Sequence, residues 1–180
     1  MAKKINQLKL ANKNVLIRCD FNVPFKGEVI SDDNRIQAAL PTINYALKAG
    51  AKVILFSHLG KVKHKGTEEE VAADKAKNNM VIVYRRLAEI LGKDKVFFSP
   101  ETSGEEVNKR VAALKPGQVL LLQNARYEKG EEKNDPALAE KWASFADVFV
   151  MDAFGSAHRA HASTFGVPEI LKARGKEVAI

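Results

Sequence analysis

Short apolar runs recur along this chain, and polar or amphipathic segments separate them. The runs lack the alternation of apolar and polar residues that marks a strand with one exposed face, so each predicts a strand covered on both faces. These runs are Val15–Cys19, Val53–Phe56, Val96–Phe98, Val119–Leu122 and Val148–Met151. Another apolar run begins at Lys176 and reaches the last residue. Because a native chain seldom ends inside an element, we expect this sequence to belong to a longer protein with a following domain.

The segments between these runs carry helical spacing of apolar residues together with start and stop signals. We expect helices over 41–48, 81–91, 103–114 and from Asp135 onward. Ser103 with Glu106 is a candidate capping box. Asp135 before Pro136 is a candidate N-cap with proline in the first turn. Residues 60–77, rich in Lys and Glu, predict a solvated loop that runs into an exposed helix.

Strands that alternate with helices predict βαβ units, right-handed crossovers and a parallel sheet. We therefore expect an α/β fold of one domain spanning residues 1–180. Its architecture should be a three-layer αβα sandwich with a mainly parallel, Rossmann-like sheet. The length of 180 residues suits one such domain.

Composition narrows the class of protein. Apolar residues make up 46% and charged residues 28%, a balance typical of globular proteins. No apolar stretch approaches the roughly 18 residues of a membrane span, and no apolar segment follows Lys3 and Lys4 as a secretory signal would require. The single cysteine, Cys19, excludes an internal disulfide framework and a cysteine-rich zinc site. We expect a cytoplasmic protein without a membrane partner.

A net charge of +7 favours anionic partners, although it does not choose between nucleic acid, membrane surface and small phosphorylated substrates. Cations and histidines follow most of the predicted strands. They are Arg18, Arg35, His58, Lys61, Arg126, His158, Arg159 and His161. Parallel strands end at one edge of a sheet, where α/β proteins bind ligands, so these groups should converge. Several arginines in one cleft fit a phosphate plus a carboxylate.

Polar residues after the first strand extend this candidate site. Asp20 and Asn22 offer an acceptor and a mixed donor and acceptor for the hydroxyl groups of a small ligand. Their simpler interpretation is an Asx turn that closes the strand. An unpaired Arg18 inside a buried strand would be costly, so we expect its side chain to point into a cleft at the strand tip. The loop residue Arg35, before the first helix, could instead form a surface salt bridge to Asp32 or Asp33.

Several kinds of chemistry lack their motifs. The chain has neither a phosphate-binding loop of the G-x-x-x-x-G-K-[ST] type nor a G-x-G-x-x-G dinucleotide motif. It also has no serine nucleophile elbow. The histidines could bind a metal in principle, but no carboxylate–histidine spacing supports this, so we expect no metal site.

Six segments resemble, in the same order, the signature motifs of phosphoglycerate kinases. They are Arg18–Pro24, Asp33–Ile43, Ser57–Gly60, Asn124–Tyr127, Gly130–Glu132 and Asp152–His161. The resemblance covers the N-terminal half of the family's protein. It implies reversible phosphoryl transfer between ATP and 3-phosphoglycerate, giving 1,3-bisphosphoglycerate and ADP. The C-terminal domain, which binds Mg-ATP or Mg-ADP, would be absent from this chain, so no cofactor is expected here and the isolated domain should be inactive.

The resemblance also implies residue roles. Asp20 and Asn22 would orient the glycerate carboxylate and hydroxyl, and Arg35 would be the catalytic arginine that stabilises the transferring phosphoryl group. The 3-phosphate would be held by a basic patch, and further motif residues would join the substrate site. The patch is His58, Arg126 and Arg159 with Arg18 behind; the further residues are Phe21, Leu59, Gly60, Lys61, His158 and His161.

At two adjacent positions the chain departs from the family, which usually has arginine and proline where Lys61 and Val62 stand here. Lysine keeps the charge but lacks the planar donor fork of arginine, so Lys61 either acts as a point charge or makes substrate binding weaker.

Two other functions fit parts of the sequence. The cations Lys61, Lys63 and Lys65 would suit a non-enzymatic module that binds nucleic acid, but the aromatic residues lie mainly in the apolar runs and offer no stacking platform. A flavodoxin-like regulatory domain would need an acidic or flavin-binding cleft. We therefore expect a monomeric kinase domain without specific nucleic-acid binding.

Overall fold

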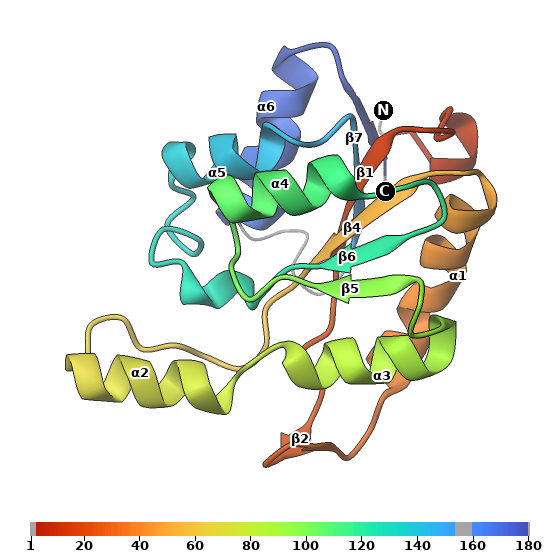
Figure 1. Cartoon of the computed structure of the whole chain (residues 1–180). Helices are drawn as coiled ribbons and strands as arrows, with labels where there is room; N and C mark the ends of the chain where they lie inside the picture. The colour runs from red at the N-terminus through yellow and green to blue at the C-terminus, as the bar shows by residue number, and fades with distance from the viewer. Residues whose placement is uncertain (1–2, 154–159, 180) are drawn as a thin grey trace.

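A six-stranded parallel sheet lies at the centre of the molecule (Figure 1). The structure is a computed structural model and describes residues 3–153 and 160–179. The strands follow the order β5-β6-β4-β1-β7-β8 across the sheet. Their bounds are β1 (Asn14–Cys19), β4 (Lys52–Phe56), β5 (Val96–Phe98), β6 (Val119–Leu121), β7 (Val148–Asp152) and β8 (Glu177–Ala179). All predicted strands are present, and the terminal apolar run is the edge strand β8, parallel to β7.

Helices cover both faces of this sheet, which confirms the predicted three-layer architecture. One face carries α1 (Asn34–Lys48) and α3 (Val81–Leu91). The other carries α4 (Glu105–Ala113), α5 (Pro136–Ala143) and α6 (Val167–Ala173). The two helical layers lie on opposite sides of the strands in Figure 1.

The apolar strands separate two hydrophobic clusters. Successive side chains of a strand point to opposite faces, so Val15 and Ile17 of β1 join the cluster under α1 and α3, while Leu16 joins the cluster under α4, α5 and α6. In the second cluster, the fully buried Trp142 packs edge-to-face on Phe56, with ring centroids 5.1 Å apart. Burial on both faces explains why the strand sequences are apolar throughout.

Two helix starts differ from the sequence-based expectations. Helix α1 begins at Asn34, so Pro41 lies inside the helix and not near its start. The loss of one backbone N–H there is compatible with a helix whose buried face packs on the sheet through Ile36 and Ile43. At α4 the N-cap is Gly104, without a side-chain cap, because Ser103 donates to Glu128 (Oγ–Oε1 3.4 Å).

Other local signals are confirmed. The Asp135 carboxylate accepts from the amide of Ala137 at 3.1 Å, and Pro136 occupies the first turn of α5. Gly50 and Gly92 follow helices at positive φ of 81° and 113°. Such backbone is easiest for glycine.

Several smaller elements lie around the sheet. They are the 3-10 turns η1 (Ile5–Gln7) and η2 (Ala125–Tyr127), the hairpin of β2 (Phe25–Lys26) and β3 (Val29–Ile30), helix α2 (Glu68–Lys77) and the π-helical turn η4 (Ala162–Gly166). Helix α2 buries none of its residues and extends away from the sheet in Figure 1. This agrees with the predicted exposed helix. Among the described residues, no helix has the length and apolar character needed to cross a membrane.

Candidate functional site

The loops after the central strands meet at the carboxyl edge of the sheet. The amide of Phe21, after β1, donates to Ser57 Oγ, after β4, at 2.9 Å. The amide of Gly60 donates to Asn22 Oδ1 at 2.8 Å. The loop after β6 joins them through Asn124, whose Oδ1 accepts from the amide of Leu59 at 3.1 Å. The predicted convergence of these strand ends is therefore present.

Arg18 lies at the centre of this edge with none of its surface exposed. Its Nε donates to Ser163 Oγ at 2.9 Å, and its Nη1 donates to Ser57 Oγ at 3.3 Å and to the Cys19 carbonyl. Burial lowers the pKa of Arg18, and the charge of Glu131 opposes this shift. The side chain does not point into an open cleft, because hydrogen bonds within the protein hold it beneath the surface.

Arg18 also favours one tautomer of His58. Its Nη2 lies 2.8 Å from His58 Nδ1. A guanidinium carries only donors, so Nδ1 must accept and a neutral imidazole then carries its proton on Nε2. His58 is nearly buried beside Arg18. The contact thus joins Arg18 in the first predicted strand to His58 just after the second.

A second buried arginine lies beside a buried carboxylate. Arg126 is 5% exposed, and its Nε donates to Glu131 Oε2 at 2.8 Å, where Glu131 is fully buried. The Nη1 atom of Arg126 donates to Glu132 Oε1 at 3.2 Å, and Nη2 lies 3.4 Å from His161 Nδ1. The backbone carbonyl of Arg126 contacts His64 Nε2 at 2.7 Å. The residue is therefore held at both its backbone and its side chain.

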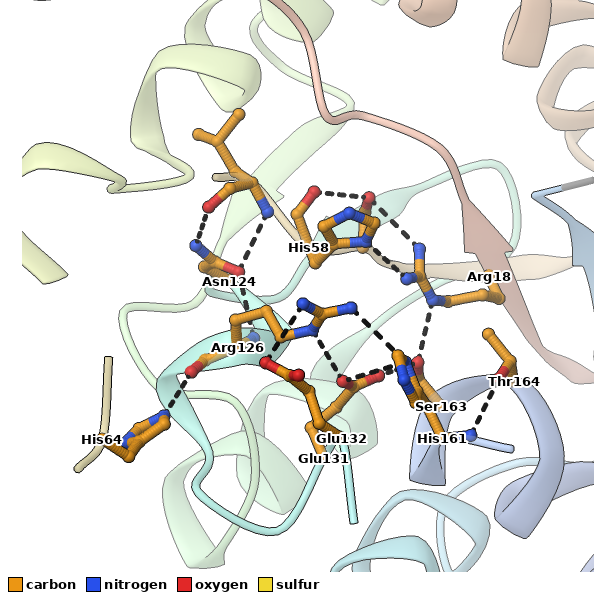
Figure 2. Close-up of polar contacts among 12 residues, drawn as sticks. Arg18, His58, His64, Asn124, Arg126, Glu131, Glu132, His161, Ser163 and Thr164 are labelled. Carbon is orange, nitrogen blue, oxygen red and sulfur yellow. Dashed lines mark hydrogen bonds and ion pairs between the residues drawn. The ribbon is translucent and has the colours of Figure 1, made fainter. Parts of the chain in front are cut away.

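Ser163 links the two arginines. Its hydroxyl accepts from Arg18 Nε and donates to Glu131 Oε1. Figure 2 shows the resulting chain of contacts from His58 through Arg18, Ser163 and Glu131 to Arg126. Residues from β1, the β4 and β6 loops and the turn before α6 thus form one buried polar network.

Arg35 lies at the rim of the site, in the first turn of α1 and not in a loop before it. Its Nη1 donates to the Asn22 carbonyl at 2.6 Å and lies 3.4 Å from Asp20 Oδ1. The alternative pairing with the neighbouring aspartates is not seen among the described residues. Asp33 pairs with Arg86 at 2.9 Å, and Asp32 accepts from the amide of Asn34 at 2.8 Å. The Arg35 side chain is 51% exposed.

The segment from Asp20 to Asn22 forms the expected Asx turn, with the Asn22 amide donating to Asp20 Oδ1 at 3.2 Å. Because Gly60 donates to Asn22 Oδ1, the side-chain atom of Asn22 that can donate to a ligand is Nδ2, which has no hydrogen-bond partner within residues 3–153 and 160–179. The turn is therefore compatible with a binding role.

The remaining predicted residues occupy different environments. The side chains of Phe21 and Leu59 are fully buried in the core under α1 and α3. Gly60 has φ +61°, and an added Cβ would lie 2.2 Å from Asn78 Oδ1. Lys61 is exposed next to it. The candidate residues His158 and Arg159 lie outside the described residues.

Three residues with structural importance at this site were not among the candidates. Glu131 and Asn124 lie within motif segments, but a carboxylate in a cationic site and a second amide did not stand out. Asn124 Nδ2 donates to the carbonyls of Leu59 (2.6 Å) and Asn78 (2.9 Å), which holds two loops together. Ser163 had no sequence signal, since isolated serines are common on surfaces.

A further ionisable group, Asp152, is the last residue of β7. Burial raises the pKa of Asp152 to about 6, although a hydrogen bond from Thr42 opposes the shift. Asp152 pairs in register with Cys19 of β1, so it lies at the same carboxyl edge. Among the described residues, no group of three or more His, Cys, Asp or Glu side chains could hold a metal ion.

The fold and this edge define an α/β domain with a preorganised cluster of arginine and histidine at its strand ends. The family model described as phosphoglycerate kinase matches residues 5–179, and the chain belongs to this family. A phosphoglycerate kinase of Listeria innocua is 55% identical over 177 residues, which cover 96% of this chain and 43% of that protein. One of Fusobacterium nucleatum is 52% identical over 173 residues, 94% of this chain and 42% of that protein.

Solved structures agree with the family assignment. The phosphoglycerate kinase of Coxiella burnetii superimposes with a TM-score of 0.77 at 37% identity, over 99% of this chain and 41% of that one. The phosphoglycerate kinase of Pyrococcus horikoshii OT3 superimposes with a TM-score of 0.78 at 30% identity, over 98% of this chain and 42% of that one. The chain therefore corresponds to the N-terminal portion of its relatives and spans less than half of their length.

Proposed function

We propose that this chain is the 3-phosphoglycerate-binding domain of a phosphoglycerate kinase. In the full-length protein it would take part in reversible phosphoryl transfer between ATP and 3-phosphoglycerate, giving 1,3-bisphosphoglycerate and ADP. The observation that supports this most strongly is the network of Arg18, His58 and Arg126 at the carboxyl edge of the sheet, in a chain of this family. Charge-assisted donors at one edge suit an anionic substrate.

The substrate phosphate would bind at Arg126 and His58, together with Arg159, His158 and His161 of the same motif. His58 would donate from Nε2, because Arg18 occupies its Nδ1. Asn22 Nδ2 would donate to the glycerate carboxylate and Asp20 would accept from its hydroxyl. Gly60 and Lys61 would border this site, while Phe21 and Leu59 would support its loops from the core.

Arg35 would stabilise negative charge on the transferring phosphoryl group. Its half-exposed guanidinium is anchored by the Asn22 carbonyl beside the proposed carboxylate site. Phosphoryl transfer depends mainly on positioning and electrostatic stabilisation, which a fixed guanidinium supplies without a protein nucleophile.

Mg-ATP or Mg-ADP would bind to the portion of the full-length protein that this chain does not span. Family membership supports this division of substrates between two domains, which would close to bring the phosphate and the carboxylate together. We also propose that the chain is monomeric and cytoplasmic, as a glycolytic enzyme of this family would be. The molar mass of the purified chain, measured by light scattering, tests the proposed monomeric state.

A titration of the isotopically labelled chain with 3-phosphoglycerate tests the proposed function. The amide resonances of Asn22, His58, Gly60 and Arg126 should shift together and saturate. Glycerate without the phosphate is the control ligand and should bind far more weakly, because the phosphate carries most of the charge. In a coupled assay with ATP the chain should show no turnover. Shifts confined to exposed lysines, or tighter binding to an oligonucleotide in about 0.15 M salt, would contradict the proposal and favour a nucleic-acid module.

A further inference from the structure

The Glu131 carboxylate lies inside the cationic site, where it contacts Arg126 and is linked to Arg18 through Ser163. Glu131 is fully buried. Its Oε2 accepts from Arg126 Nε at 2.8 Å, and its Oε1 accepts from Ser163, which in turn accepts from Arg18 Nε at 2.9 Å. We propose that Glu131 is a positioning residue for substrate binding, which orients Arg126 directly and Arg18 through Ser163. The inference deepens the proposed function and rests on it.

Two effects of opposite sign act at this carboxylate. Its negative charge repels a bound phosphate, so by Coulomb's law alone its removal would strengthen anion binding. Its hydrogen bond to Arg126 Nε, however, orients the guanidinium, whose Nη atoms lie next to Glu132 and His161. Preorganised donors avoid the cost of ordering when the ligand binds. The proposal requires that the gain in affinity from orienting the Arg126 guanidinium exceeds the loss from repulsion between Glu131 and the substrate phosphate.

The backbone around Glu131 supports its positioning role. The Glu131 carbonyl accepts from the amide of Ala162 at 2.8 Å, which ties the loop after η2 to the turn that carries His161 and Ser163. His161 Nδ1 lies 3.6 Å from Glu131 Oε2. Glu131 therefore holds the loop of Arg126 against the turn that carries His161 and Ser163.

The neighbouring residue Glu132 provides a matched control. It contacts the same guanidinium, with Oε1 3.2 Å from Arg126 Nη1, but its side chain is 54% exposed. Replacing either glutamate by glutamine removes the same charge from the same arginine. Only Glu131→Gln places a buried amide where two carboxylate oxygens accepted, from Arg126 and from Ser163, and an amide replaces one of those acceptors by an NH2 donor.

The experiment measures the affinity of the chain for 3-phosphoglycerate by titration calorimetry. Glu131→Gln should weaken binding by about tenfold, because the charged acceptor of Arg126 is replaced by a weaker, uncharged one. Glu132→Gln should leave affinity unchanged or raise it by up to about threefold, since an exposed charge is screened. Equal or tighter binding by Glu131→Gln would overturn the proposal. If the unmodified chain itself binds no 3-phosphoglycerate, the proposed function fails instead.

A second variant keeps the test decisive if Glu131→Gln does not fold, which thermal unfolding will show. Ser163→Ala retains Glu131 but removes the link to Arg18. It should weaken binding by about two- to fivefold, since a single buried hydroxyl is lost. It should also shift the ¹⁵N resonance of Arg18 Nε and alter the imidazole ¹⁵N resonances of His58. Unchanged affinity with unchanged resonances would show that the network does not position the site.

Discussion

Arg18 and Arg35 carry the same charge at the same edge of the sheet, yet the structure gives them different roles. Arg18 is fully buried and donates to Ser163, Ser57 and His58. Arg35 is half exposed and has its closest carboxylate contact with Asp20 at 3.4 Å. We therefore expect the substitution by methionine, which is of similar length and uncharged, to have very different effects on stability at the two positions.

Arg18→Met should destabilise the domain severely. The substitution leaves the acceptors of Ser163 and His58 without their charged donor and removes a cation that offsets the buried charge of Glu131. Removing one partner of a buried charged network costs about 3–5 kcal/mol. For a domain of this size, each kcal/mol lowers Tm by about 2–4 °C, which gives a loss of roughly 6–20 °C.

Arg35→Met is the matched control. Its free energy of unfolding should lie within about 1 kcal/mol of that of the unmodified chain, because exposed ion pairs contribute little to stability. Urea denaturation followed by fluorescence measures both variants. Trp142 is the only tryptophan and is fully buried, so its emission reports loss of the core. If the free energy of unfolding of Arg18→Met lies within about 1 kcal/mol of that of the unmodified chain, Arg18 does not stabilise the fold through the buried network.

Three further predictions concern catalysis, pH and the backbone. In the full-length protein, Arg35→Ala should lower turnover by at least about 100-fold with little change in 3-phosphoglycerate affinity; a loss confined to affinity would reassign Arg35 to ground-state binding. Because burial raises the pKa of Asp152 from 3.8 to about 6, folding favours the protonated carboxyl, and stability should fall as the pH rises through about 6. Asp152→Asn should flatten that part of a Tm–pH profile and raise Tm at pH above 7, whereas an unchanged profile would contradict the assignment. Gly60→Ala should cost about 2–3 kcal/mol in urea denaturation, because its φ is +61° and its Cβ would meet Asn78; a cost below about 1 kcal/mol would show that the loop relaxes freely.

Much of the fold follows from local patterns. Apolar runs such as Val53–Phe56 predicted the strands, since a strand buried on both faces leaves no alternation. The N-cap at Asp135 could also be predicted from the sequence, because a cap depends on a few neighbouring residues. Local signals failed where tertiary contacts compete with them. Ser103 contacts Glu128 and does not cap α4, and Pro41 lies within α1, where packing on the sheet outweighs one missing hydrogen bond.

In the candidate site, too, local patterns predicted some features and tertiary contacts decided the others. The residue types after each strand, together with the rule that parallel strands end at one edge, were sufficient to predict that cations such as Arg18 and Arg126 converge. Which cation is buried and which is exposed depends on the strand order and on residues distant in sequence. Ser163 is far from Arg18 in sequence and reaches it only in the folded chain, in which β7 lies beside β1. Glu131 joins them from the loop after β6, and no local pattern carries that information. Periodicity and caps are properties of a few consecutive residues, whereas burial and charge pairing belong to the folded chain as a whole.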